Sequence, residues 1–160
     1  MEEAKKKIIL DEKAAYAKAE HFCAYQERAQ QEVRDKLYHD GLHQNAVENI
    51  ISTLITEGFI NEERFAKAYA RGKFNQKGWG KIKIKQGLKF KKVPDILIKK
   101  ALLTIPDEDY IRALQKILTK KAALITEKNA YKRNYKLQQY ALNRGYEGDI
   151  IADVLKELVD

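Results

Sequence analysis

The residues best able to do chemistry in this 160-residue chain are its 31 lysines and arginines, which are concentrated in the middle third. Between Arg64 and Lys100 there are 13 basic side chains and a single acid, Asp95, so the local charge is +12. Residues 1–63 carry −5 and residues 101–160 carry +1. Like charges at this density repel one another and lower the stability of the fold unless a bound anion neutralises them. The sequence therefore predicts a basic surface that binds a polyanion or an acidic protein.

The candidate contacts to such a partner are basic side chains of this run, one aromatic ring and a second basic group further along the chain. Trp79 lies between two glycines in a cationic loop, where its ring could fold onto the core or stack with a base. The sequence leaves both possibilities open. Phe74 and Phe90 also lie among the lysines, but both fit the apolar faces of helices. The expected binding residues are Arg71, Lys73, Lys77, Trp79, Lys81, Lys83, Lys85, Lys89, Lys91, Lys92, Lys132, Arg133 and Lys136.

No set of residues indicates catalysis or a metal site. His39 and His43 are four positions apart, but a glycine between them interrupts the helix that would align them as ligands. Cys23 lies in an apolar segment typical of a buried thiol. The pair Glu62 and Glu63 begins a helix, and the chain has neither a phosphate-binding glycine loop nor a nucleophile–base signature. We expect a protein that is not an enzyme and has no metal or other cofactor.

Composition favours a helical protein of a reducing compartment. The chain has two prolines, eight glycines and 44% hydrophobic residues, which is enough apolar material for a core and includes few helix breakers. No run approaches the roughly 20 apolar residues of a membrane span, and residues 1–13 lack the apolar stretch of a secretory signal. The single cysteine forms no internal disulfide. We therefore expect a cytoplasmic monomer that does not bind membranes.

One apolar pattern occurs three times. Apolar residues at offsets 0, 3, 4 and 7 begin at Val47, again at Ile98 and again at Ile151, and these offsets define one face of a helix. The second copy is displaced by 51 residues and the third by a further 53. Such a displacement indicates tandem repeats whose neighbours support each other, since units of this length bury little surface alone.

The element before each patterned helix also recurs. Gly41 and Gly145 occupy equivalent positions, where glycine commonly ends a helix in the left-handed conformation. Lys92 takes the same position in the middle copy and lacks that freedom. Pro94 follows it and ends the element anyway, because proline suits the first turn of the next helix.

Asp11, Asn61 and Asp107 begin the three repeats, and these residue types are good N-terminal caps. Each repeat then reads as three helices. The expected fold is all-α: three tandem three-helix repeats that form an elongated, curved protein. The expected domains are residues 1–58 (acidic), 59–105 (strongly basic) and 106–160.

Two stretches resemble the RecX family of recombinase regulators: FINEERFAKAYARGK at residues 59–73 and WGKIKI at residues 79–84. The resemblance covers nearly the whole chain from about residue 14. Two departures affect local helix geometry: Ala29-Gln30-Gln31 lacks a serine that the family often has, and Gly87 and Lys92 stand where a polar helix former and a glycine are expected. The first-repeat pattern of the family is matched by Arg28, Glu32, Val33, Lys36, Leu37 and Gly41.

The resemblance implies a partner and an activity. It implies that the protein binds the RecA recombinase filament on single-stranded DNA and lodges in the filament groove. There it would hinder filament growth, ATP hydrolysis and co-protease activity, in DNA repair and the SOS response. No catalytic residues come with the family.

Three alternatives predict different behaviour. A stand-alone nucleic-acid-binding module would bind free DNA with a steep salt dependence. A helix-turn-helix transcription regulator would discriminate between duplex sequences, but residues 64–100 contain only two arginines and are poor in groups that read base edges. A structural scaffold would keep its partners after the basic repeat is neutralised. The acidic residues 1–63 argue against a plain DNA coater and should face protein or solvent.

Overall fold

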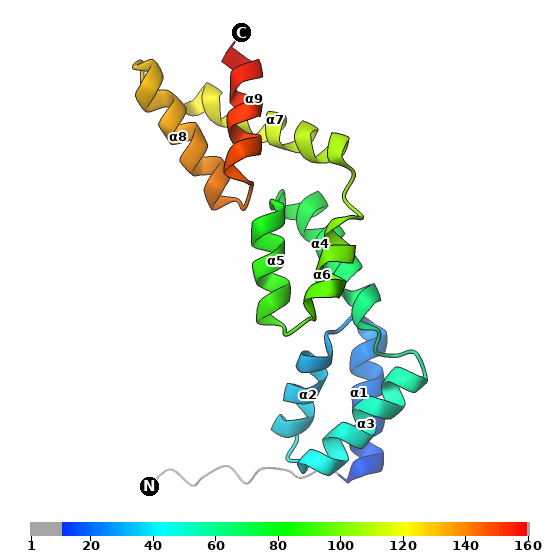
Figure 1. Cartoon of the computed structure of the whole chain (residues 1–160). Helices are drawn as coiled ribbons and strands as arrows, with labels where there is room; N and C mark the ends of the chain where they lie inside the picture. The colour runs from blue at the N-terminus through cyan, green and yellow to red at the C-terminus, as the bar shows by residue number, and fades with distance from the viewer. Residues whose placement is uncertain (1–10, 160) are drawn as a thin grey trace, which may run out of the picture. The chain divides into compact units, whose positions relative to one another are not determined.

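The computed structural model describes residues 11–159, and these residues form nine α-helices and no β-strand (Figure 1). The all-α prediction is confirmed, as are the three successive three-helix repeats. No helix within the described range is long and apolar enough to cross a membrane. The helices are α1 (Glu12–Tyr25), α2 (Gln30–His39), α3 (Gln44–Thr56), α4 (Glu62–Lys77), α5 (Lys81–Phe90), α6 (Asp95–Leu102), α7 (Asp107–Leu124), α8 (Ala130–Asn143) and α9 (Gly148–Val159).

The helices divide into two compact units. The first unit contains residues 11–66 with residues 91–93, and the second contains residues 67–90 with residues 94–159. Helix α4 begins in the first unit and continues in the second. The expected domain boundaries near residues 58 and 105 stay predictions, and so does the elongated, curved shape.

The first unit is built on the apolar faces of α1, α2 and α3. Side chains at helical spacing from each helix meet in one core. Ile60, just before α4, closes this core. The apolar face expected from Val47 onward is buried as predicted. The main core residues are Ala15, Ala19, Val33, Leu37, Val47, Ile50, Ile51 and Leu54.

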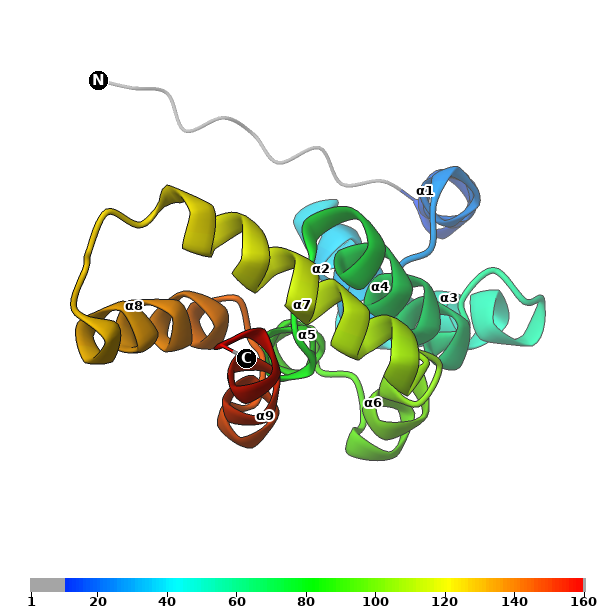
Figure 2. The same cartoon turned by 90° about the horizontal axis from the view of Figure 1, so that it is seen from above.

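The second unit has buried side chains from both of its repeats, on α5 and α6 and on α7, α8 and α9. The two views show α7 crossing α9 (Figures 1 and 2), and α7 contacts both α8 and α9. Two expectations are wrong: Phe90 is 87% exposed at the end of α5, and Leu158 is 42% exposed on α9. Fully buried side chains include Ile84, Leu88, Ile98, Tyr110, Leu114, Leu118, Tyr146 and Ile151.

The predicted helix starts are mostly correct. Asp11 and Asn61 each accept a hydrogen bond from the backbone N–H three residues later, at 2.7 and 2.9 Å. Asp107 is the first residue of α7, and Pro106 holds the cap position. Pro94 likewise precedes α6 as its cap and does not lie in its first turn. Proline at these positions presets the backbone angle but supplies no side-chain acceptor.

The three equivalent helix ends share one backbone conformation. Gly41 and Gly145 have φ values of 91° and 97°, and Lys92 has a φ of 60°. Among the described residues, Lys92 is the only one other than glycine with a positive φ. The repeat therefore imposes the left-handed turn on the middle copy even though its residue there disfavours it.

Candidate nucleic-acid and protein interface

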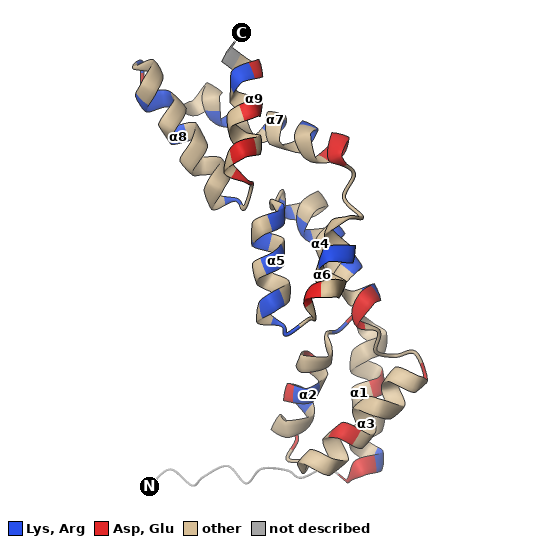
Figure 3. Ribbon diagram, in the orientation of Figure 1, with Lys and Arg blue, Asp and Glu red and all other residues tan. Residues whose placement is uncertain are grey.

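Helix α5 presents lysines and no acidic residue (Figure 3). Lys85 and Lys89 are exposed along α5, and Lys92 is exposed in the turn that follows it. Arg71 and Lys77 are exposed on α4. Exposed ammonium groups at this density attract phosphate groups and acidic side chains. These five of the predicted residues therefore have their side chains in solvent, where a partner could reach them.

Trp79 is half-buried and lies among cations. The ammonium groups of Lys73 and Lys83 lie 4.9 and 4.7 Å from the centroid of its ring, within cation–π range. Tyr69 meets the same ring edge-on, with centroids 6.5 Å apart. The Trp79 ring thus packs on a tyrosine and lies beside two lysines, and stacking with a base stays a prediction.

Gly87 lets Tyr69 approach α5. A Cβ atom at Gly87 would lie 2.1 Å from the hydroxyl oxygen of Tyr69. The ring of Tyr69 also lies 5.5 Å from the ammonium of Lys73, so Tyr69 contacts both Trp79 and one of the two lysines beside the Trp79 ring. The departure from the family pattern at Gly87 is therefore explained by the close contact of this tyrosine with the helix.

The loop that carries Trp79 is fixed by a backbone-to-backbone contact inside the second unit. The N–H of Gly80 donates to the carbonyl of Arg144 at 2.7 Å, and the N–H of Ile82 donates to the carbonyl of Gly145 at 2.9 Å. A Cβ at Gly80 would lie 2.3 Å from the carbonyl carbon and oxygen of Gly145. Only glycine allows these two backbone segments to lie this close. We call this contact the glycine joint.

Side chains of the α8–α9 turn bind the same loop. The guanidinium of Arg144 donates to the carbonyl of Lys77 at 2.7 Å, and the hydroxyl of Tyr146 donates to the carbonyl of Gly78 at 3.1 Å. Burial raises the pKa of Tyr146 to about 12. These bonds satisfy carbonyls at the end of α4 that the helix itself leaves unpaired.

Tyr110 links the start of α5 to the turn before α9. Its hydroxyl accepts from the N–H of Lys81 at 3.0 Å and donates to the carboxylate of Glu147. Burial, and then the hydrogen bond to Glu147, raises the pKa of this phenol well above its ordinary range. The ammonium of Lys81 lies 4.8 Å from the Tyr110 ring and 3.9 Å from Asp107. Lys81 therefore has contacts within the protein and is less available than Lys85.

Lys91 is also engaged within the protein. It groups with the first unit, where its ammonium pairs with Glu32 at 3.3 Å. Lys91 is therefore less available to a partner than the exposed Lys85 and Lys89. Its neighbour Lys92 has an exposed side chain.

The predicted residues of the third repeat have different roles. Arg133 donates to two carbonyls near the end of α7, at 3.0 and 2.5 Å, so it holds α8 against α7. Lys136 pairs with Glu127 at 3.8 Å and is exposed. Lys132 is exposed in the first turn of α8. Of these three, Lys132 is the most accessible to a partner and Arg133 the least.

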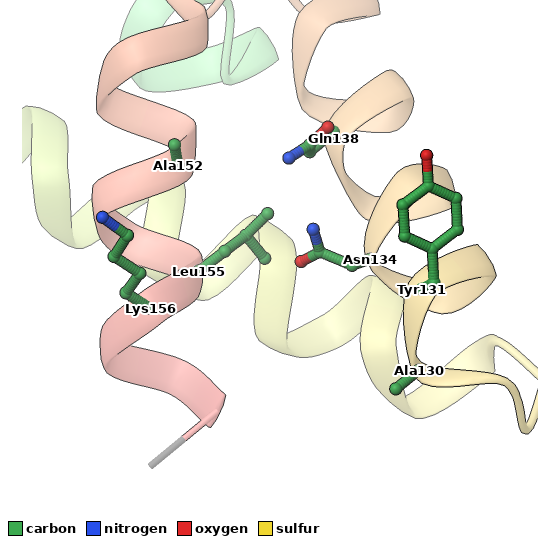
Figure 4. Close-up of a pocket in the computed structure, with 7 residues that line it drawn as sticks. All are labelled: Ala130, Tyr131, Asn134, Gln138, Ala152, Leu155 and Lys156. Carbon is green, nitrogen blue, oxygen red and sulfur yellow. The ribbon is translucent and has the colours of Figure 1, made fainter.

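An open groove of about 640 Å³ lies between α8 and α9. Asn134 and Gln138 point into it from α8, and Leu155 points into it from α9 (Figure 4). Tyr131, which is 83% exposed, lies at its rim. No lysine of α5 lines this groove. Within residues 11–159, no three side chains of metal-binding type are grouped together.

Sequence reasoning missed the residues that position the site. The glycine joint depends on Gly80 and Gly145, and the bonds around it depend on Arg144, Tyr146 and Tyr110. The only available signal was the pair of glycines on either side of Trp79. That pair indicates a close approach, but it does not name the segment that approaches.

The fold and this surface define a class, that of an all-helical binding protein made of three-helix repeats. Comparison with known families makes the class specific. Residues 15–54, 61–102 and 107–155 match the domains described as RecX, first, second and third three-helix domain. The chain belongs to the RecX family. Its curated relatives are regulatory proteins, so its role is regulatory.

Individual relatives agree. The regulatory protein RecX of Clostridium acetobutylicum is 32% identical over 159 residues, which cover 94% of this chain and 72% of that protein. The regulatory protein RecX of Bacillus mycoides is 29% identical, and the match covers 91% of this chain. The chain spans 54% of the length of that Bacillus protein.

Two solved structures have the same fold. The crystal structure of RecX from Lactobacillus salivarius superposes with a TM-score of 0.86 at 28% identity, covering 92% of this chain and 96% of that one. A crystal structure titled regulatory protein RecX gives a TM-score of 0.83 at 22% identity, covering 91% and 71%. The second likeness concerns the fold alone.

Proposed function

We propose that this protein binds the RecA recombinase filament on single-stranded DNA and restrains it. The effect is mainly inhibitory, on recombination, on ATP hydrolysis and on co-protease activity during DNA repair and the SOS response. The observation that carries the proposal is the acid-free, lysine-bearing surface of α5, with the cationic Trp79 loop fixed beside it by the glycine joint. Membership of the RecX family supports the same partner.

The thirteen predicted residues divide into two groups under this proposal. Six of the seven exposed residues contact the filament: Arg71, Lys77, Lys85, Lys89, Lys92 and Lys132. The others shape or hold the surface. Lys73 and Lys83 flank Trp79, and Lys81, Lys91, Arg133 and Lys136 are engaged in contacts within the protein.

The mode of action is binding, and no chemical step is assigned to any residue. A monomer that works in the cytoplasm, where the filament forms, suffices for this mechanism. Binding to the filament stabilises one of its states at the expense of others, and it shifts that equilibrium only as far as the difference between the two affinities.

The test is ATP hydrolysis by the recombinase of the same organism on single-stranded DNA, titrated with this protein at two salt concentrations. Inhibition at well below one regulator per recombinase is expected, because one molecule bound in or at the end of a filament affects many subunits. Inhibition that added DNA simply relieves would instead indicate competition for DNA, and it would favour a stand-alone nucleic-acid-binding module.

A further inference from the structure

A second cationic site lies on the first unit, which is acidic as a whole. A pocket of about 270 Å³ opens beside α1 and α2. This volume is slightly below the range of about 300–1,000 Å³ for sites that enclose a drug-sized ligand. All of its lining side chains are basic or aromatic, and none is acidic. They are Lys18, His21, Phe22, Tyr25, Arg28 and Lys36.

Two of its cations share one aromatic ring. The guanidinium carbon of Arg28 lies 3.7 Å from the centroid of Phe22, and the ammonium of Lys36 lies 5.0 Å from the same point. Within the described chain, neither Arg28 nor Lys36 has a carboxylate within 4.0 Å. Both cations line the same pocket and repel each other, so an anion bound in it would stabilise the pair.

The third lysine of the pocket is already neutralised. Lys18 pairs at 3.5 Å with Asp40, which is 8% exposed. The uncompensated charge of the pocket therefore belongs to Arg28 and Lys36. The guanidinium of Arg28 is oriented by one bond, from Nε to the carbonyl of Phe22 at 3.1 Å. Its remaining N–H groups are the kind of forked donor that suits a phosphate.

The pocket also offers an exposed aromatic face. Tyr25, the last residue of α1, is 78% exposed, and its ring centroid lies 6.0 Å from the guanidinium of Arg28. A phosphate-binding pair of cations next to an exposed aromatic ring is the combination that single-stranded nucleic-acid sites use, with the backbone on the cations and a base on the ring. A carboxylate of an acidic peptide would use the cations but would gain little from the ring.

We propose that this pocket binds one nucleotide of a single strand, with its phosphate between Arg28 and Lys36 and its base on Tyr25. The first unit thus takes part in nucleic-acid binding although its net charge is negative. The inference extends the proposed function, but it concerns DNA alone and can be tested without recombinase. If no strand contacts this pocket but the protein still inhibits the filament, the pocket proposal is wrong and the proposed function stands.

The experiment uses the full chain and a thymidine oligonucleotide carrying 5-bromodeoxyuridine. Ultraviolet cross-linking and mass spectrometry of tryptic peptides should place a cross-link in the peptide of residues 19–28, which contains Tyr25. Tyr25→Ala should remove this cross-link and weaken binding about fivefold or more, as expected for one stacked base. Lys36→Gln should weaken the salt dependence, reducing the magnitude of the slope of log affinity against log salt by about 0.7.

The matched control is Lys13→Gln, which removes one positive charge from an exposed site on the same helix α1, away from the pocket. It should leave the cross-link in place, and helical circular dichroism should be the same for all three variants. Cross-links confined to the second unit, with all three variants binding alike, would overturn the proposal. Loss of the cross-link when a glutamate-rich peptide of equal charge is present during irradiation would also overturn it, in favour of an acidic protein ligand.

Discussion

Lys92 holds a backbone conformation that glycine adopts at the equivalent places in the other two repeats. A side chain in the left-handed region costs about 1 kcal/mol or more because Cβ approaches the following carbonyl. We therefore expect Lys92→Gly to raise the free energy of unfolding by up to about 1 kcal/mol. Lys89→Gly makes the same change inside α5 and should lower it by about 1 kcal/mol. Urea unfolding followed by circular dichroism measures both, and equal effects of the two changes would refute the strain argument.

A second residue-scale prediction concerns Gly87 and the support of Trp79. A methyl group there would lie 2.1 Å from the hydroxyl of Tyr69, so the tyrosine must move away from α5. Trp79 is the single tryptophan of the chain, and Tyr69 meets its ring edge-on. Gly87→Ala should therefore shift the tryptophan emission to longer wavelength as the ring becomes more exposed. Unchanged emission would mean that Tyr69 does not hold the ring.

What the sequence predicts at the residue scale is mostly local. The caps at Asp11 and Asn61 and the left-handed turns at Gly41 and Gly145 follow from side-chain chemistry within a few positions, and the structure confirms them. Phe90 was assigned to the core from its apolar character, and it is exposed. Its burial depends on which neighbours cover the end of α5, and that is not local information.

The glycine joint is the main prediction at the scale of elements. Gly80→Ala would place a Cβ 2.3 Å from backbone atoms of Gly145, which cannot move aside as a flexible side chain can. Overpacking of this kind costs about 1–3 kcal/mol, and the change should lower the melting temperature. The control is Gly72→Ala in α4, where nothing lies within 4 Å. It should stabilise the protein by about 0.5–1 kcal/mol, so calorimetry should show shifts of opposite sign.

The contact between Tyr110 and the start of α5 predicts an alkaline transition. The folded protein holds the phenolic proton more tightly than the unfolded chain, because burial and Glu147 raise its pKa. That contribution to stability is complete below about pH 10 and is lost as the pH rises above it. Tyr110→Phe should cost about 1–2 kcal/mol at pH 7, through the unpaired N–H of Lys81 and the lost bond to Glu147.

The same variant should lose less stability than the wild type between pH 9 and 11, and thermal unfolding across that range measures the difference. A residual decrease is expected from Tyr146, whose pKa is about 12. Parallel pH profiles for variant and wild type would remove Tyr110 from the explanation.

Most helices are predictable here because they have an apolar period and recognisable ends, although the period is weak in α1. The joint is not, because it forms between segments more than 60 residues apart through backbone atoms. Backbone contacts leave little trace in the sequence beyond small residues. Arg133 shows the same limit, since its charge indicated a binding role while its bonds to carbonyls of the α7 end show a structural one.

At the scale of the whole molecule, the proposed function predicts which charges matter. Replacing the exposed residues Lys77, Lys85, Lys89 and Lys92 together by Gln should abolish inhibition of recombinase ATP hydrolysis while leaving helix content unchanged. A control variant should inhibit like the wild type: it replaces by Gln four other exposed lysines, Lys13, Lys116, Lys120 and Lys128. Equal inhibition by both variants would remove the basic surface from the mechanism.

The charge distribution was readable from the sequence, because net charge needs no coordinates. The exposure of each charged side chain could not be predicted in this way. Lys85 and Lys91 look alike in sequence, yet one is exposed and the other is paired with Glu32. The pocket beside Phe22 shows the opposite limit, because the fold groups several cations there although the surrounding sequence is acidic overall.

The glycine joint also has a consequence for protein synthesis. The carbonyl of Gly78 accepts its hydrogen bond from the hydroxyl of Tyr146, which is synthesised 68 residues later. At roughly 5–20 residues per second, that delay is on the order of 3–14 s. During this delay the Trp79 loop lacks its bonds to residues 144–146, although Tyr69 is already present to pack on Trp79. The nascent chain therefore carries the lysines of this loop several seconds before it can form the glycine joint that positions them.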